Sequence, residues 1–152
     1  MAEFLAGIGK NVILMTAITA WFTAQVLKTI TAYWRHGAFN AERLVGAGGM
    51  PSSHTALVVS LAVGLALREG LESDLFAVSV ILAGIVMYDA AGVRRAAGKQ
   101  AKVINKLVRE MRVEHTVRET RLKELLGHTP LEVLGGAVHG SVIAYAFYIF
   151  YR

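Results

Sequence analysis

Long runs of apolar residues, separated by short polar segments, dominate this chain. Four blocks stand out, at residues 11–34, 55–67, 75–88 and 131–151. A helix that crosses a bilayer needs about 20 residues, and the first and fourth blocks reach that length. The second and third blocks are shorter and can span only if their polar ends face the protein interior or a water-filled cleft. A helical hairpin buried in a soluble protein is the alternative interpretation of the short blocks.

The polar stretch before the fourth block carries another pattern. Its apolar residues recur at helical spacing, at Val103, Ile104, Leu107, Val108 and Met111. This spacing predicts an amphipathic helix outside the lipid or along its surface. No linker, repeat or low-complexity run divides the chain. We therefore expect an all-α integral membrane protein, a helical bundle of about four spanning helices with a surface amphipathic helix between the third and fourth. Residues 1–152 would form a single membrane-embedded domain.

Composition favours the same fold class. Hydrophobic residues make up 55% of the 152 residues and charged residues 18%, whereas ordinary soluble domains have about 45–50% and about 25%. Cysteine is absent, which excludes disulfides and thiolate metal sites. The chain begins without a basic region and a small-residue cleavage site, so we expect no cleaved signal peptide.

The distribution of charge predicts the orientation in the membrane. Net charge is +5, and beside apolar blocks such cations favour anionic lipid head groups over nucleic acid as partners. With four spans, one side of the membrane carries both 35–50, with two cations, and 90–130, with ten of the 16 lysines and arginines. The positive-inside rule places that side in the cytoplasm.

Three polar motifs and one pair of cations fall on that same side. They are Gly-Gly-Met-Pro-Ser-Ser-His at 48–54, the run from Asp89 through Arg94, Arg95 and Lys99, Gly-His-Thr-Pro-Leu-Glu at 127–132, and Lys28 with Arg35. Lys28 and Arg35 are two helical turns apart and face the same way. Helix starts have unpaired N–H groups that hold anions. Three helix ends and the cation pair can thus surround one pocket near the membrane surface.

These residue types are typical of phosphoryl transfer. The reacting phosphoryl group develops charge on its equatorial oxygens, which lysine, arginine and helix-end amides stabilise. One imidazole can attack phosphorus while a carboxylate fixes its tautomer, and a second imidazole can protonate the leaving alcohol. His128 and Glu132 are one helical turn apart and can meet, and His54 can supply the second imidazole. No metal or other cofactor is required.

Each motif also has a purely structural interpretation. Residues 129–132 fit a capping box in which the glutamate only closes a helix, and either serine of 52–53 fits an N-cap. Lys28 can extend along its helix to the membrane surface. The arginines at 94–95 can anchor to lipid, and Asp89 can cap a helix or pair with an arginine.

A zinc site is a further alternative for the histidines. Its ligands would be His54, His128, His139 and Glu132. The sequence lacks the spacing of an HExxH site, which makes this alternative weaker than phosphoryl transfer.

Taken together, these residues resemble the type 2 phosphatidic acid phosphatase superfamily, which also includes the vanadium haloperoxidases. The superfamily motifs read K-x6-R-P, P-S-G-H and S-R-x5-H-x3-D. The chain is similar to the first over 28–36, with histidine for proline, and to the second over 51–54, with serine for glycine. It is similar to the third over 128–132, with glutamate for aspartate. The third-motif arginine is displaced, because six residues rather than five separate Arg121 from His128.

A divergent branch of small membrane proteins in that superfamily is closer still. Its members carry G-G-M-P-S-S-H, M-Y-D-A-A-G-V-R-R-A-A-G-K-Q-A and L-G-H-T-P-x-E-V, which this chain has at 48–54, 87–101 and 126–133. The resemblance implies that His128 is a nucleophile that forms a phosphohistidine, that Glu132 orients it and that His54 is the general acid. The phosphate-binding residues that it implies are Lys28, Arg35, Ser52 and Ser53, with Arg94, Arg95 or Arg121 in place of the third-motif arginine, and Asp89 and Lys99 in support.

The sequence thus predicts a membrane phosphatase acting on a lipid phosphate from the cytoplasmic side. Phosphatidylglycerol phosphate, phosphatidic acid and polyprenyl phosphates are the expected substrate types. One alternative is a catalytically silent protein that binds lipid phosphate as a scaffold. A vanadate-type oxidase is the other, and the membrane blocks and short chain argue against it. Residues 92–123 have three open roles: to cover the pocket, to rest on head groups, or to join two copies in a homo-oligomer.

Overall fold

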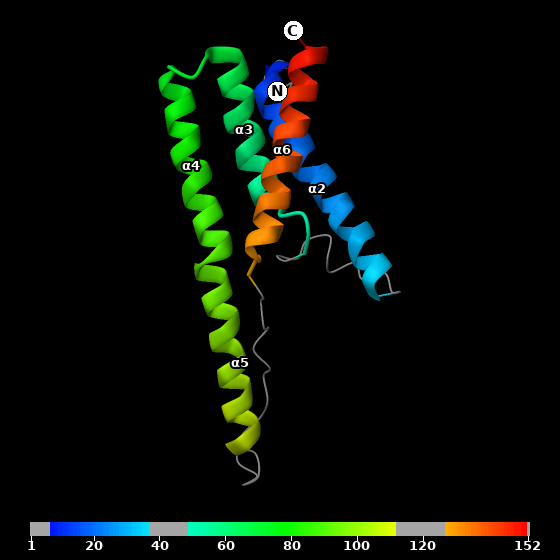
Figure 1. The fold of residues 1–152 in the computed structure, drawn as a ribbon, viewed down its shortest axis with the longest axis vertical. Helices are drawn as coiled ribbons and strands as arrows, with labels where there is room; N and C mark the ends of the chain where they lie inside the picture. Colours follow the sequence, from blue (N-terminus) through cyan, green and yellow to red (C-terminus); the bar gives the residue numbers. More distant parts are fainter. Residues whose placement is uncertain (1–6, 37–48, 112–126, 152) are drawn as a thin grey trace.

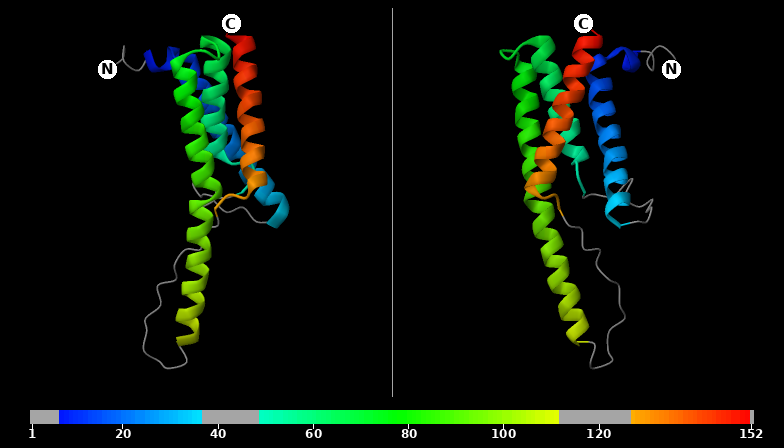
Figure 2. Two further views of the ribbon diagram at one scale, coloured as in Figure 1. Left: turned by 60° about the vertical axis from the view of Figure 1, so that its left-hand side comes forward. Right: turned by 45° about the vertical axis from the view of Figure 1, so that its right-hand side comes forward.

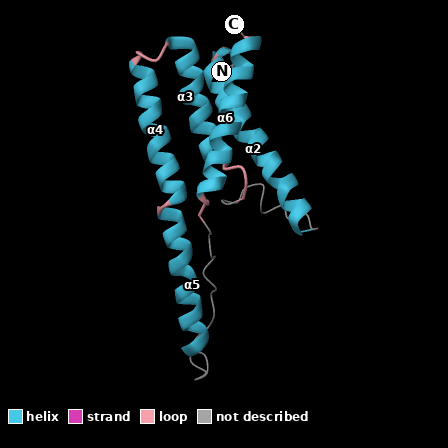
Figure 3. Ribbon diagram, in the orientation of Figure 1, coloured by secondary structure: helices cyan, strands magenta, loops and turns pink. Residues whose placement is uncertain are grey.

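The computed structural model describes residues 7–36, 49–111 and 127–151. In these ranges the regular structure is helical, with a short turn of helix at 7–10 before the first long helix (Figure 3). The long helices are α2 (Val12–His36), α3 (Ser53–Glu69), α4 (Asp74–Ala91), α5 (Val93–Met111) and α6 (Pro130–Phe150). The expected all-α fold class is confirmed.

Four of these helices, α2, α3, α4 and α6, form a bundle (Figures 1 and 2). α3 contacts the other three and is the centre of the bundle. Successive helices run in opposite directions, so the end of α2, the start of α3, the end of α4 and the start of α6 lie at one end. We call this the motif end, because the sequence motifs fall there. The start of α2 and the ends of α3 and α6 lie at the opposite end.

Three segments of the described chain are long and apolar enough to cross a membrane. They are Val12–Trp34, Asp74–Arg109 and Pro130–Phe150, the second of which joins α4 to α5. α3 has 17 residues and is enclosed by α2, α4 and α6. The expected membrane bundle is therefore confirmed, with three segments of spanning length arranged around a shorter central helix.

Small residues let α3 and α6 approach until their backbones touch. A Cβ added to Gly140 would lie 3.1 Å from the Cα of Ala56, and one added to Gly136 would overlap the carbonyl of Ser52. Gly136 and Gly140 are four residues apart, the small-xxx-small spacing that suits close helix packing in lipid. This contact fixes how the starts of α3 and α6, which carry the two histidine motifs, lie against each other.

Replacing Gly140 with leucine should destabilise the bundle strongly. The added side chain has no space between α6 and α3, so the helices must separate, at a cost of about 3 kcal/mol. Thermal unfolding in detergent, followed by circular dichroism, measures this. Gly84→Leu is the matched control, because a Cβ there meets nothing within 4 Å. Equal melting temperatures for the two variants would contradict the packing described here.

The predicted amphipathic helix is present as α5. It continues the line of α4 and extends away from the bundle beyond the motif end (Figures 1 and 2). Among the helices of the described chain, it contacts α4 alone. Val103, Ile104 and Leu107 of its apolar stripe are exposed.

Candidate active site at the motif end

The start of α3 is fixed by its own cap and by α6. Ser52 is the N-cap of α3. Its Oγ accepts hydrogen bonds from the backbone N–H of Thr55 at 3.4 Å and from the hydroxyl of Thr55 at 3.1 Å. The backbone N–H of Ser52 donates to the carbonyl oxygen of Glu132 at 2.9 Å. Ser52, Ser53 and Thr55 are all buried. The Pro-Ser-Ser-His segment is therefore held directly against the start of α6.

The start of α6 has a complete capping box. Thr129 Oγ1 accepts from the backbone N–H of Glu132 at 3.3 Å, and Glu132 Oε2 accepts from the backbone N–H of Thr129 at 2.9 Å. The same Oε2 lies 3.1 Å from Nδ1 of His128. Glu132 thus closes the helix and binds the imidazole with one oxygen, so the two interpretations of 129–132 describe one arrangement.

The ring of His128 is buried and its tautomer follows from its partner. Only 1% of the residue is exposed, and its backbone N–H donates to the carbonyl of Ala90, at the end of α4, at 3.0 Å. A carboxylate can only accept hydrogen bonds, so Nδ1 carries the proton in this contact. The lone pair of a neutral ring then lies on Nε2, which suits that nitrogen for attack on an electrophile.

The two imidazoles of the motifs lie together. The ring centroids of His54 and His128 are 6.1 Å apart, with an angle of 64° between the planes. His54 occupies the first turn of α3, and His128 directly precedes the cap of α6. The α3–α6 contact therefore brings together two residues that are 74 positions apart in the sequence.

Lys28 lies inside the bundle rather than along its surface. It is 2% exposed, which argues against the interpretation that it extends to the membrane surface. Its carbon chain runs beneath Gly49, where an added Cβ would lie 2.9 Å from Lys28 Cγ. Gly49 has φ +96°, a conformation that favours glycine. The carboxylate of Glu132 and the Lys28 side chain carry opposite charges and interact electrostatically.

The loop before α3 is also tied to α2. The hydroxyl of Thr31 donates to the carbonyl of Met50 at 2.9 Å. Thr31 is three residues after Lys28, so the same face of α2 holds the loop and presents the cation. Sequence reasoning missed Thr31, and it gave no separate role to Gly49 or Thr55, which lie within or next to the motif at 48–54. The position of Thr31 beside Lys28 was the signal that could have found it.

The remaining predicted site residues are described in part. Arg35 is in the last turn of α2, and Arg94 and Arg95 are in the first turn of α5, but their side chains lie outside the described part of the chain. Arg121 lies wholly outside it. Asp89 is half-buried near the end of α4, and Lys99 is exposed on α5.

The zinc alternative needs His139 beside His54 and His128, but His139 makes its contact with α2 instead. Nε2 of His139 is 2.9 Å from the hydroxyl of Thr23, a contact that joins α6 to α2 within the bundle. Among the residues that the structure describes, no group of three or more histidine, cysteine, aspartate or glutamate side chains is placed to hold a metal ion. The described geometry therefore gives the zinc alternative no support.

Comparison with known proteins supports the resemblance drawn from the motifs. The family model described as the Divergent PAP2 family matches residues 9–143, a range that includes both histidine motifs and Lys28. A relative from Bacillus subtilis (strain 168), called uncharacterized membrane protein YuiD, is 42% identical over 152 residues, covering 90% of this chain and 96% of the relative. No solved structure matches the chain. This membrane protein therefore belongs to the Divergent PAP2 family, a divergent branch of the type 2 phosphatidic acid phosphatase superfamily.

Proposed function

We propose that this protein is a metal-independent phosphatase that hydrolyses a phosphomonoester of a membrane lipid through a phosphohistidine. The observation that carries the proposal is the contact between the buried ring of His128 and the half-buried carboxylate of Glu132, with Nδ1 and Oε2 3.1 Å apart, beside the second imidazole of His54. A nucleophile, an orienting carboxylate and a nearby acid are groups that suit covalent phosphoryl transfer.

In the first step, Nε2 of His128 attacks phosphorus. The bond between phosphorus and the lipid oxygen breaks, and the leaving oxygen takes a proton from the His54 imidazolium. The products are the lipid alcohol and a phosphohistidine. Glu132 accepts from Nδ1–H throughout, which holds the ring in the reactive tautomer and stabilises the positive charge that develops on it.

In the second step, water attacks phosphorus and the bond to Nε2 breaks. His54, now neutral, takes a proton from the water, which restores its starting state. Inorganic phosphate leaves, and His128 is again neutral. The two steps consume one water and yield one lipid alcohol and one phosphate, so no oxidant or further reactant is needed.

Three groups suit the stabilisation of charge on the phosphoryl oxygens. The ammonium of Lys28 is buried at this end, where the low dielectric strengthens its attraction for an anion. The hydroxyl of Ser53 is buried and has no hydrogen-bond partner within the described ranges, so it can donate to a phosphate. The start of α3, at the positive end of the helix dipole, also favours an anion.

The position of the site suits a lipid substrate. It lies at one end of a bundle whose outer helices are long enough to span a membrane, near the depth of a head group. We place this end at the cytoplasmic face, because the described cations of α5 lie beyond it. Labelling of a Lys102→Cys variant of this cysteine-free chain only from outside the cell would contradict that placement.

The purified protein should release phosphate from lipid phosphomonoesters without added metal. The panel is phosphatidylglycerol phosphate, phosphatidic acid and a polyprenyl phosphate in mixed micelles, assayed for phosphate with and without EDTA. We expect turnover of at least one lipid and no effect of EDTA, because imidazole supplies the nucleophile. Binding of these lipids without turnover would favour the scaffold alternative, and loss of activity with EDTA would overturn the metal-independent mechanism.

Replacing His54 should slow turnover in a way that depends on the leaving group. We expect His54→Gln to lower the rate of phosphoenzyme formation about 10²–10⁴-fold on a lipid phosphate, the usual scale for general acid catalysis. With p-nitrophenyl phosphate this rate should fall far less, because its leaving group departs without a proton. Single-turnover kinetics measure this rate for the two substrates and separate it from the second step, which both share. Equal losses in this rate would show that His54 does not act as the general acid.

A further inference from the structure

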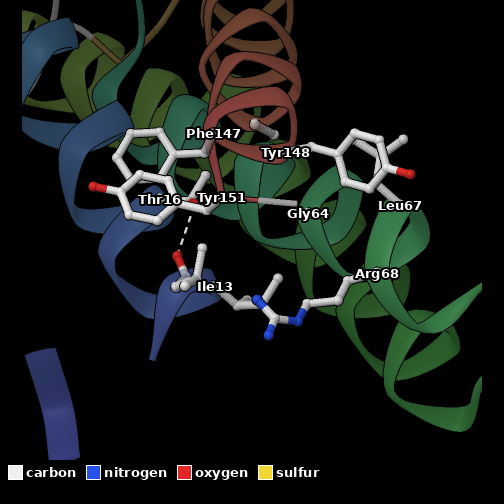
Figure 4. A pocket seen from close by; sticks show the side chains of 10 residues that line it. Ile13, Thr16, Gly64, Leu67, Arg68, Phe147, Tyr148 and Tyr151 are labelled. Carbon is white, nitrogen blue, oxygen red and sulfur yellow. Dashed lines mark hydrogen bonds between the residues drawn. The ribbon is translucent and has the colours of Figure 1, made fainter. Parts of the chain in front are cut away.

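A cavity of about 290 Å³ lies at the opposite end of the bundle from the two imidazoles (Figure 4). The ends of α3 and α6 and the start of α2 enclose it. Its lining includes the polar or charged residues Thr16, Arg68, Tyr148 and Tyr151 and apolar residues such as Leu67 and Phe147. This cavity shares no lining residue with the proposed phosphatase site.

Arg68 connects this cavity to a more open groove beside the start of α2. The groove has a volume of about 600 Å³, and Val12, Ile13 and Arg68 line both spaces. Figure 4 shows the Arg68 side chain extending from α3 toward Ile13 of α2. Lys10 also lines the groove, as does one carboxylate, that of Glu69. Two cations, Lys10 and Arg68, and one carboxylate, Glu69, give the lining of this groove a net positive charge; we call these three residues the rim.

The walls of the groove are apolar. Leu61 and Leu65 of α3 and Leu75 of α4 line it, along with Leu14 of α2. The groove therefore combines cations with a leucine-lined surface on α2, α3 and α4, and α2 and α4 belong to segments that are long and apolar enough to cross a membrane. Tyr148 and Tyr151 lie at the same end, where tyrosine is favoured at the boundary between lipid and water.

We propose that this end of the bundle binds an anionic glycerophospholipid of the surrounding bilayer. Arg68 and Lys10 contact the phosphodiester, and an acyl chain lies along the leucines. A guanidinium presents paired donors that match phosphate oxygens, which suits Arg68 for this role. The apolar walls favour a lipid over a soluble anion, because they offer an acyl chain contacts that inorganic phosphate cannot make. The site is separate from the phosphatase site and does not depend on its activity.

The alternative role of Arg68 is local. It lies in the last turn of α3, where a cation interacts favourably with the helix dipole. That role requires no lipid and would leave lipid selectivity unchanged when the residue is replaced. Measurement of bound lipid therefore separates the two roles.

The test uses the full-length protein in nanodiscs with equal amounts of phosphatidylglycerol and phosphatidylcholine. Native mass spectrometry then counts the lipids that stay bound after release. We expect wild type to retain phosphatidylglycerol in excess, and Arg68→Gln and Lys10→Gln each to lower that excess about fivefold, the scale of one cation near an anionic lipid. The matched control is Arg109→Gln, which removes the same charge from α5 and should retain the full excess.

Three outcomes would overturn the proposal. They are wild type without an excess of phosphatidylglycerol, an Arg68→Gln variant with the wild-type excess, and displacement of the lipid by millimolar inorganic phosphate. The last result would indicate a site for a soluble anion. If Arg68→Gln does not fold, Lys10→Gln alone decides, because Lys10 is exposed on the short helical turn before α2. Phosphate release at the motif end should be unchanged in these variants.

Discussion

His128→Ala should abolish phosphate release altogether. The substitution removes the atom that attacks phosphorus, and the neighbouring His54 is the proposed proton donor to the leaving oxygen. The carboxylate of Glu132 is bound by Thr129 N–H and sits on the far side of the ring, at Nδ1, so it is poorly placed to attack in place of Nε2. Because covalent catalysis is lost rather than weakened, we expect a rate at the level of the uncatalysed control.

The measurement is phosphate release, together with trapping of the phosphoenzyme from a ³²P-labelled lipid phosphate. Wild type should give a label that is stable to alkali and lost in acid, as a phosphohistidine is, and His128→Ala should give none. His139→Ala is the matched control, since it removes a different histidine, which lies within α6 and contacts Thr23 instead of the site residues. Full activity or an unchanged label in His128→Ala would rule out His128 as the nucleophile.

The sequence predicts the helices and the chemical groups well, because both depend on local patterns. Long apolar blocks predict membrane helices, and the capping residues Ser52 and Thr129 mark where α3 and α6 begin. The pairing of His128 with Glu132 was also predictable from their separation of four residues, although His128 precedes the N-cap Thr129 and the contact is made across the capping box. These features need no knowledge of how distant segments pack.

The features that the sequence did not predict depend on packing between segments that are distant in the chain. The central place of α3 depends on its backbone contact with Gly136 and Gly140, which hydropathy does not encode. A block of 13 apolar residues therefore predicted a marginal span, where the fold has an enclosed helix. The burial of Lys28 beneath Gly49 has the same origin, since it depends on a loop that α2 holds through Thr31. The cavity at the opposite end has no sequence motif at all, because its lining comes from three helix ends.

Glu132→Gln should separate the two tasks that this one side chain performs. Glutamine is accepted at this position of a capping box, and its amide oxygen can still accept from the backbone N–H of Thr129. The start of α6 should therefore persist. The charge is lost, however, so the imidazolium of the reaction has no counter-charge, and an amide that turns its NH₂ toward Nδ1 stabilises the wrong tautomer of His128.

We expect Glu132→Gln to lower kcat about 10⁴-fold, the scale that the loss of an orienting carboxylate has in the serine protease triad. The substitution also removes the favourable interaction between the Glu132 charge and the Lys28 ammonium, the proposed phosphate-binding cation, which should lower kcat further. The measurement is kcat beside the melting temperature for Glu132→Gln and Glu132→Ala. Alanine should lower both, since it removes the carboxylate that accepts from the backbone N–H of Thr129, at a cost of about 1 kcal/mol, as well as the charge. If Glu132→Gln keeps its activity while Glu132→Ala loses stability, Glu132 serves the helix alone, and the attacking imidazole must be oriented by another group.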